Sequence, residues 1–350
     1  MIITSLFTSR KFFVVTLTED RLRELFGNFK GKRIAVVGDL MLDRYYWGTV
    51  RRISPEAPVP VIEVDSESVR LGGAANVANN IQSLGGEPIL VGLIGNDHPG
   101  ELLLSLLKDQ NLSTHGIVVD GSRPTTIKTR VIAHSQHVVR VDNESKSDCP
   151  KHLIPPIIDS VKYHIHSLDG IILEDYNKGV ITKEVIREVT AVAQKYGKII
   201  TVDPKLDNFL EFKNVTLFKP NRREVEETLG GRLRTVEDVV CAGKKLMGLL
   251  SAQNILLTRG DEGVSLFEAN GDVSHMRNVA KHVHDVSGAG DTVISTLTLA
   301  LSGGATAREA SVLANCAAGV VVGSVGIVPI QPRELMESVL EFSNNMRHAE

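Results

Sequence analysis

The sequence predicts an α/β protein with a central, mostly parallel β-sheet and a small β-sheet lid. From residue 150 onwards, short apolar runs alternate with stretches of helical periodicity, which is the pattern of repeated strand–helix units. Each apolar run ends in polar or charged residues, as expected where the carboxyl ends of parallel strands form a ligand-binding edge. Two segments, about 44–69 and 123–142, instead contain prolines or alternating β-branched residues, and we expect them to pair as the lid.

The composition excludes several classes of protein. The chain has 350 residues, a net charge of −3 and 42% hydrophobic residues, which is ordinary for a globular protein with a large core. It has no basic excess for nucleic acid or an acidic membrane surface, and no apolar stretch long enough to span a bilayer. The three cysteines stand apart without metal-type spacing, as in proteins of a reducing compartment. We therefore expect a cytoplasmic protein without a nucleic-acid or membrane partner.

The N-terminal residues 1–30 are expected to form a tail and one short helix, followed by a main domain over 31–345. The tail has a short apolar patch but no signal-peptide pattern. The first strand of the sheet is the β-branched run 33–38, and Asp39 follows it at the carboxyl end. An acid at this edge could hold the hydroxyl groups of a substrate, or it could simply cap a turn.

A pair of glycines, Gly72 and Gly73, opens the next predicted helix, and Asn76 lies in its first turn. Small residues at a helix start let a polar ligand approach the backbone closely, and an amide can both donate to and accept from hydroxyl groups. The same small residues would also suit a helix packed tightly against the sheet. This segment alone leaves both interpretations open.

The lid segments would bring positive side chains, such as Lys128 and Arg140, above the strand ends. A lid of this kind excludes water from a reaction and supplies charge to a ligand. The alternative is an ordinary solvated strand face.

Four strands are predicted after residue 150, at 170–173, 198–202, 215–218 and 255–258. Single charged residues after a strand are usually solvated, but a whole set at one edge of a sheet favours a binding site. The set consists of Asp175, Lys178, Asp203, Lys205, Asn221, Glu224 and Asp291.

The stretch Gly288-Ala289-Gly290-Asp291 precedes an apolar helical run over 293–301. Free N–H groups at a helix start, together with the helix dipole, bind anions such as phosphate. Asp291 could accept a proton from a hydroxyl group while these N–H groups stabilise charge on a phosphoryl group. The alternative is an ordinary glycine-rich loop before a helix.

Three stretches together resemble the signatures of the ribokinase-like sugar kinases. Two of them are 72–78 near the front and 285–292 near the end of the chain, and Asn221-Arg222-Arg223-Glu224 is similar to the NxxE motif of that family. The resemblance covers about residue 32 to the C-terminal helix. It implies the ribokinase-like three-layer α/β/α fold, ATP as phosphate donor and Mg²⁺, and it leaves the need for a monovalent cation open.

A closer resemblance is to the D-glycero-β-D-manno-heptose-7-phosphate kinases, through 38–43, 54–60, 174–179 and 203–205. That family phosphorylates the anomeric (C1) hydroxyl to give the 1,7-bisphosphate, a step towards ADP-heptose and the inner core of lipopolysaccharide. Some members are fused to an adenylyltransferase domain, and this chain resembles the stand-alone form. The resemblance also implies a homodimer formed through the lid.

The family resemblance implies a role for each matching residue. It makes Asp291 the base that deprotonates the sugar, with Gly288, Ala289 and Gly290 as the anion hole. The implied sugar-binding residues are Asp39, Gly72, Gly73 and Asn76. Charge, rather than a motif, suggests Arg140 and Lys178 for the 7-phosphate. The nucleotide is expected at Lys219, Asn221, Arg222, Arg223, Glu224, Thr258, Gly260 and Asn315. Of these, Asn221 and Glu224 would organise Mg²⁺ through water.

Other functions are compatible with parts of the pattern. A ribokinase-like kinase could act on another sugar or sugar phosphate, and only the lid chemistry would differ. A non-catalytic sugar-phosphate sensor on the same fold is disfavoured because Asp291 is present. A dinucleotide dehydrogenase is also disfavoured, because Gly288-Ala289-Gly290 lacks the third glycine of that fingerprint.

Overall fold

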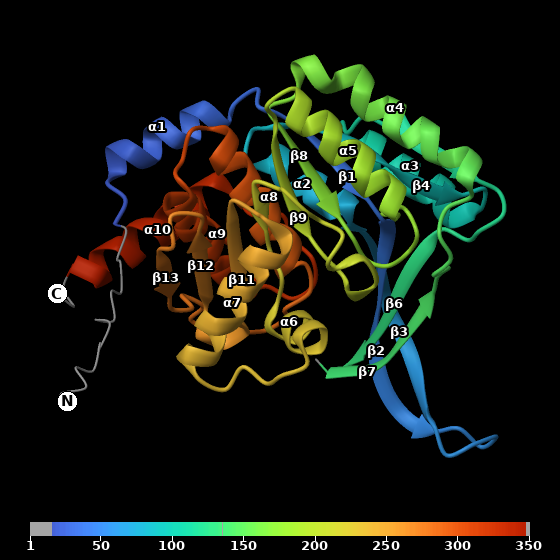
Figure 1. The fold of residues 1–350 in the computed structure, drawn as a ribbon. Helices are drawn as coiled ribbons and strands as arrows, with labels where there is room; N and C mark the ends of the chain where they lie inside the picture. Colours follow the sequence, from blue (N-terminus) through green and yellow to red (C-terminus); the bar gives the residue numbers. More distant parts are fainter. Residues whose placement is uncertain (1–15, 135, 348–350) are drawn as a thin grey trace.

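The computed structural model describes residues 16–134 and 136–347, so most of the expected N-terminal tail lies outside the described residues. The chain folds into a nine-stranded sheet, a four-stranded sheet, and helices on both faces of the larger sheet (Figure 1). This arrangement confirms the predicted three-layer α/β/α fold with a small β lid.

The large sheet has the strand order β13-β12-β11-β10-β9-β8-β1-β4-β5. All neighbours from β5 to β11 pair in parallel, whereas β12 and β13 add an antiparallel edge. The strands are β1 (Arg33–Gly38), β4 (Glu87–Gly95), β5 (Gly116–Asp120), β8 (Gly170–Glu174), β9 (Ile199–Asp203), β10 (Leu217–Phe218), β11 (Asn254–Thr258), β12 (Val264–Glu268) and β13 (Val273–Met276). Because β1, β8 and β9 are neighbours, their carboxyl ends lie together near the middle of the sheet.

Two apolar cores hold the helices against the sheet. Alternate residues of β1 face opposite sides, with Ile34 and Val36 in one core and Ala35 and Val37 in the other. The first core includes residues of α1 (Glu19–Phe29), α2 (Ala74–Ser83), α3 (His98–Asp109), α8 (Ala289–Ser302), α9 (Ala307–Val321) and α10 (Pro332–Arg347). The second core includes residues of α4 (Ile154–His164), α5 (Lys183–Lys195), α6 (Arg222–Leu229) and α7 (Val236–Leu250). Both faces of the parallel sheet are therefore covered, as such sheets require.

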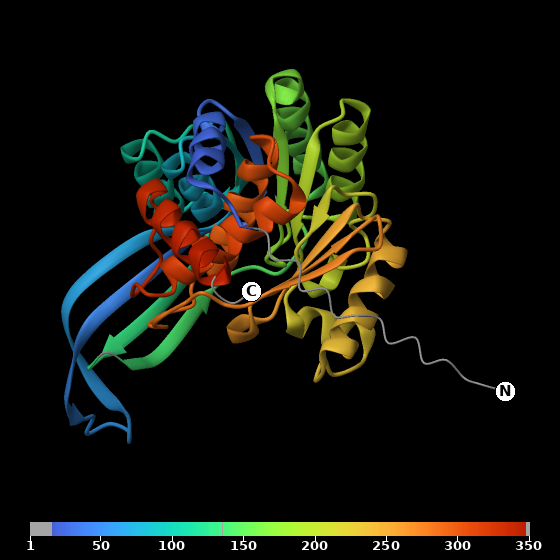
Figure 2. The same ribbon diagram turned by 90° about the vertical axis from the view of Figure 1, so that its left-hand side faces the viewer.

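The lid is the four-stranded sheet, with the order β3-β2-β6-β7. Its strands are β2 (Leu40–Ile53), β3 (Pro60–Gly73), β6 (Thr126–Ala133) and β7 (Gln136–Asn143). The long hairpin of β2 and β3 projects from the main body (Figure 2). Because β2 starts directly after Asp39 and β3 runs directly into α2, the lid connects two of the predicted site segments.

Several elements have no counterpart in the sequence-based prediction, among them the helices α6 and α7 and the strands β5, β12 and β13. The three strands are the hardest to predict. They are short strands of four or five residues at the two ends of the sheet, where few residues are available to establish a pattern. Within the described residues, no helix combines the length and the apolar character needed to cross a membrane.

Candidate active site

Asp291 lies in the first turn of α8, three residues after the glycine that caps this helix. Gly288 has a φ of 77°, a left-handed backbone that favours glycine, and a Cβ there would lie 2.9 Å from Nδ2 of Asn76. The buried carboxylate of Asp291 accepts hydrogen bonds from Asn76 Nδ2 at 2.7 Å and from the Tyr176 hydroxyl at 2.6 Å. Burial raises the pKa of Asp291 to about 6, although both hydrogen bonds lower it.

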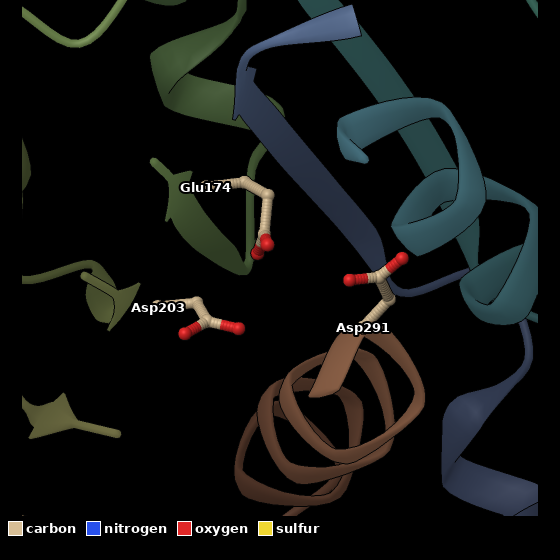
Figure 3. A group of neighbouring side chains, drawn as sticks. All are labelled: Glu174, Asp203 and Asp291. Carbon is tan, nitrogen blue, oxygen red and sulfur yellow. The ribbon is translucent and has the colours of Figure 1, made fainter. Parts of the chain in front are cut away.

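Two more acids point towards Asp291 from the ends of neighbouring strands (Figure 3). Glu174 ends β8 and Asp203 ends β9, and one oxygen from each acid lies within 4.8 Å of the others. Glu174 is fully buried, and among the described residues neither of its carboxylate oxygens has a hydrogen-bond partner. Burial, and then the charges of Asp203 and Asp291, raise the pKa of Glu174 well above its usual value. An all-oxygen group with an unpartnered carboxylate is chemically suited to a divalent cation such as Mg²⁺.

Two lysines offset part of this negative charge. The ammonium group of Lys219 is 2.8 Å from the carboxylate of Asp203. The same ammonium group lies close to the start of α8, because a Cβ added to Gly290 would be 3.7 Å from it. Lys205 is 3.1 Å from Glu224 and 3.9 Å from Asp203. Positive charge therefore lies beside the start of α8, where a phosphoryl group bound by the helix N–H groups would need it.

Asn221 and Glu224 form the capping box of α6. The N–H of Glu224 donates to Asn221 Oδ1 at 2.9 Å, and the N–H of Asn221 donates to Glu224 Oε2 at 2.8 Å. Oε1 of Glu224 contacts Lys205, so the contacts of both side chains stabilise local structure. Burial raises the pKa of Glu224. A carboxylate offers further lone pairs, which leaves a water-mediated contact with Mg²⁺ compatible with this geometry.

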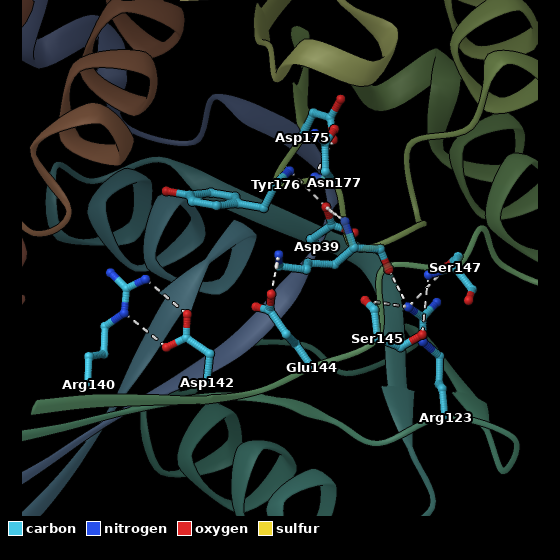
Figure 4. Close-up of polar contacts among 11 residues, drawn as sticks. Asp39, Arg123, Arg140, Asp142, Glu144, Ser145, Ser147, Asp175, Tyr176 and Asn177 are labelled. Atoms are coloured by element: carbon cyan, nitrogen blue, oxygen red, sulfur yellow. Dashed lines mark hydrogen bonds and ion pairs between the residues drawn. The ribbon is translucent and has the colours of Figure 1, made fainter. Parts of the chain in front are cut away.

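Asp39 fixes the loop that follows β8. Its buried carboxylate accepts a hydrogen bond from the N–H group of Tyr176 at 2.8 Å (Figure 4). It also accepts from the N–H groups of Lys178 at 3.0 Å and Val180 at 3.0 Å. These contacts match the turn-capping alternative, and a role of Asp39 in sugar binding stays a prediction. Gly73 pairs with Leu40 at the base of the lid, so Gly72 and Gly73 lie next to Asp39, and their role in sugar binding also stays a prediction.

The two cations expected to bind a distant phosphate both have carboxylate partners. Lys178 contacts Glu144 at 2.8 Å, and both side chains are largely buried. Arg140 contacts Asp142 at 2.9 Å on the exposed strand β7. Their charges are therefore already neutralised locally.

Tyr176 connects the lid, the sheet and α8. Its hydroxyl reaches Asp291, and its ring lies between Lys128 of β6, 5.0 Å from the ring centroid, and Lys205, 4.9 Å from it. Each distance falls within the range of a cation–π interaction. A side chain from the end of β8 thus contacts both the proposed base and the lid.

The residues expected at the nucleotide fall into two groups. Thr258 bridges to Asn221, and Gly260 begins the turn after β11, so these residues lie near Lys219 at the strand ends. Arg222 contacts Glu262 at 2.5 Å, and Arg223 is exposed on α6 beside Glu227.

Asn315 of α9 donates its amide N–H to the carbonyl oxygen of Arg277 at 2.8 Å. Asn278, the residue after Arg277, donates to the carbonyl oxygen of Gly260 at 3.3 Å, so Asn315 adjoins the turn after β11. A cavity of about 620 Å³ adjoins the Arg277 segment, between α9 and α10. Its lining carries both signs of charge, because Arg277 and Lys281 lie there beside the three glutamates Glu334, Glu337 and Glu341.

Sequence reasoning missed Glu174 and Tyr176 as members of this site. It recognised the segment 174–179 but selected Asp175 and Lys178, because it cannot tell which side chains at a strand end point towards the neighbouring helix. A period of two would have been the available signal, since Glu174 and Tyr176 alternate with Asp175.

Comparison with known proteins gives a consistent result. Residues 32–333 match the pfkB family carbohydrate kinases. The chain is 40% identical over 318 residues to the bifunctional protein HldE of Geobacter sulfurreducens, which covers 91% of this chain and 65% of that protein. It is 42% identical over 295 residues to the HldE of Helicobacter pylori, which covers 84% of this chain and 64% of that protein. The chain thus spans slightly less than two thirds of these relatives.

Solved structures with the same fold are also sugar kinases. Arabidopsis thaliana ribokinase complexed with ribose and ATP has a TM-score of 0.68 at 20% identity, covering 90% of this chain and 99% of that one. Phosphofructokinase-2 from Escherichia coli in complex with potassium has a TM-score of 0.73 at 19% identity, with the same coverage. At this identity the likeness establishes the fold.

Proposed function

Because the chain belongs to the pfkB family of carbohydrate kinases, we propose that it transfers the γ-phosphoryl group of ATP to the C1 hydroxyl of D-glycero-β-D-manno-heptose 7-phosphate. The observation that carries this proposal is the buried carboxylate of Asp291, held by Asn76 and Tyr176 at the start of α8. Identity of about 40% to proteins named HldE supports a heptose phosphate over other sugars.

In the proposed reaction, Asp291 accepts the proton of the sugar hydroxyl while that oxygen attacks the γ-phosphorus. The bond from the γ-phosphorus to the bridging oxygen breaks, and ADP leaves with the electron pair. A pKa of about 6 keeps Asp291 ionised at neutral pH and makes it a stronger base than an exposed aspartate. The N–H groups of Gly288, Ala289 and Gly290, with Lys219 beside them, would stabilise charge on the phosphoryl oxygens.

The donor set near Asp291 is compatible with Mg²⁺. Asn221 and Glu224 would hold the ion through water, and the group of Glu174, Asp203 and Asp291 offers a second set of oxygen donors. When bound, Mg²⁺ neutralises charge on the phosphates of the nucleotide. Lys205 links the two donor sets by contacting Glu224 and lying near Asp203.

The sugar would be bound by Asp39, Gly72, Gly73 and Asn76. ATP would be contacted by Lys219, Thr258, Gly260 and Asn315, and Arg222 and Arg223 would lie at the edge of the nucleotide site. Arg140 and Lys178 would flank the 7-phosphate. The product would be used in the synthesis of ADP-heptose for lipopolysaccharide, and the reaction would take place in the cytoplasm. Two copies of the chain would form a homodimer through their lids.

A substrate panel tests the proposed function. ATP consumption is measured with heptose 7-phosphate, ribose, fructose and fructose phosphates at equal concentrations, and ³¹P NMR identifies the phosphorylated position. We expect the highest kcat/KM with heptose 7-phosphate and a new phosphate at C1. Preference for another sugar would identify a kinase of different specificity, and ligand binding without turnover of any sugar would indicate a sensor.

A further inference from the structure

The lid carries more positive than negative charge on the side that meets Tyr176. Lys128 of β6 pairs in register with Asp43 of β2 on one side and with Asp142 of β7 on the other. With the next loop included, five cations and three carboxylates lie there. The cations are Arg70, Lys128, Arg130, Arg140 and Lys178, and the carboxylates are Asp43, Asp142 and Glu144.

Each of these carboxylates is already engaged by a cation other than Lys128. Arg130 forms a buried ion pair with Asp43, Arg140 contacts Asp142, and Lys178 contacts Glu144. Within residues 16–134 and 136–347, Lys128 has no carboxylate at ion-pair distance. Among the same residues, Arg70 of β3 also lacks a carboxylate partner on this face, but it donates to the carbonyl oxygen of Ile327. Lys128, by contrast, contacts only the ring of Tyr176 in this part of the chain. We therefore call Lys128 the surplus cation of the lid.

Burial disfavours the charge of Lys128 and lowers its pKa. Its ammonium group lies 5.0 Å from the centroid of the Tyr176 ring, so a cation–π contact offsets only part of the lost hydration. A partly desolvated cation needs a counter-charge, and a doubly charged phosphate on a ligand would supply it. The other end of the same tyrosine contacts Asp291. One aromatic side chain thus separates the surplus cation from the proposed base.

We infer that Lys128 binds the phosphate that the sugar substrate already carries, while the hydroxyl to be phosphorylated lies at Asp291. The inference rests on the proposed kinase function and adds to it the residue that selects phosphorylated sugars. Tyr176 would act as the spacer that sets the separation between the two subsites. Arg140 and Lys178, being paired, would contribute less than Lys128 to this selection.

The first experiment measures specificity in Lys128→Met, which keeps the length of the side chain and removes its charge. Loss of a charge-assisted contact should raise KM for heptose 7-phosphate on the order of 10- to 100-fold, with KM for ATP unchanged. KM for the unphosphorylated heptose should change little, so that the preference for the phosphorylated sugar disappears. Lys128→Arg should restore most of the preference. Lys162→Met, at an exposed lysine of α4, is the matched control.

A second measurement separates this inference from the choice of sugar. Inorganic phosphate should raise the melting temperature of the wild-type protein and of Lys162→Met more than that of Lys128→Met, in which only the site at the start of α8 would still bind it. If heptose 7-phosphate is not a substrate while this difference holds, the proposed substrate is wrong and the phosphate subsite stands. If Lys128→Met keeps the preference for phosphorylated sugar, or Arg140→Met alone abolishes it, Lys128 is not the phosphate ligand.

Discussion

The hydroxyl of Tyr176 donates a 2.6 Å hydrogen bond to Oδ1 of Asp291, so a side chain from the end of β8 covers the proposed base at the start of α8. The other oxygen of the same carboxylate accepts from Asn76. A sugar hydroxyl must therefore use a remaining lone pair of Asp291 or displace Tyr176. Either way, Tyr176 and Asn76 fix the direction in which the base points, and both lower its pKa.

Replacing Asp291 by asparagine should abolish most turnover without preventing nucleotide binding. The amide cannot accept the proton of the sugar hydroxyl, and removal of a general base lowers kcat on the order of 10²- to 10⁴-fold. Steady-state kinetics measures the loss of turnover, and titration calorimetry with ATP measures whether nucleotide binding is kept. Asp159→Asn, at an exposed aspartate of α4, should behave like the wild type. Turnover retained by Asp291→Asn would remove Asp291 from the role of base.

The pH profile of kcat/KM should have an acidic limb near pH 6. Burial raises the pKa of Asp291 to about 6, so protonation of the base below that value should reduce kcat/KM about tenfold per pH unit. The hydrogen bond from Tyr176 lowers this pKa, and Tyr176→Phe removes it. The limb should therefore move to higher pH in Tyr176→Phe. The profile is measured by initial rates between pH 4.5 and about 8 at saturating ATP.

Asn76→Ala provides the second half of the same experiment. It removes the other hydrogen bond that lowers the pKa of Asp291, so its acidic limb should also move upwards. A limb that stays in place in both variants would mean that another group titrates. A limb that moves downwards would contradict the stated contacts.

The sequence predicted the fold and the edge of the site better than the contacts within it. Asp291, Asn76 and the strand ends could be brought together because parallel strands place their carboxyl ends at one edge. Tyr176 and Glu174 were missed, because their alternation with Asp175 places them on one face but does not tell that this face meets α8. The ion pair between Lys178 and Glu144 joins residues far apart along the chain. The charge of Lys178 alone therefore did not reveal that this lysine already has a carboxylate partner.

The Mg²⁺ requirement should depend on Glu224. Outer ligands that act through water typically change metal affinity by about 10- to 100-fold, so Glu224→Gln should raise the Mg²⁺ concentration needed for half-maximal activity by about that factor. The measurement is a Mg²⁺ titration at fixed ATP. Glu227→Gln, at an exposed glutamate of the same helix, is the control. If Glu174→Gln raises the requirement and Glu224→Gln does not, the acid group around Asp291 holds the ion instead.

The lid should mediate the proposed homodimer through its exposed valines. The sheet has large apolar side chains that are 40–60% exposed, at Ile53, Val59, Val64, Val138, Val139 and Val141. Strand β7 is also the edge of its sheet, where unpaired backbone groups favour association. Val139 and Val141 alternate with Arg140 and therefore lie on the face away from Lys128.

Val141→Asp should weaken this dimer because it places a charge where an apolar side chain would be buried. Burial of one valine is worth about 1.5–3 kcal/mol, so the dissociation constant should rise at least about tenfold. Sedimentation velocity over a range of protein concentrations measures the change. Val119→Asp makes the same substitution at a half-exposed valine outside the lid, on the edge strand β5 of the large sheet, and should leave the dimer intact. A wild-type protein that is monomeric at every concentration, or a dimer that survives Val141→Asp, would exclude the lid as the interface.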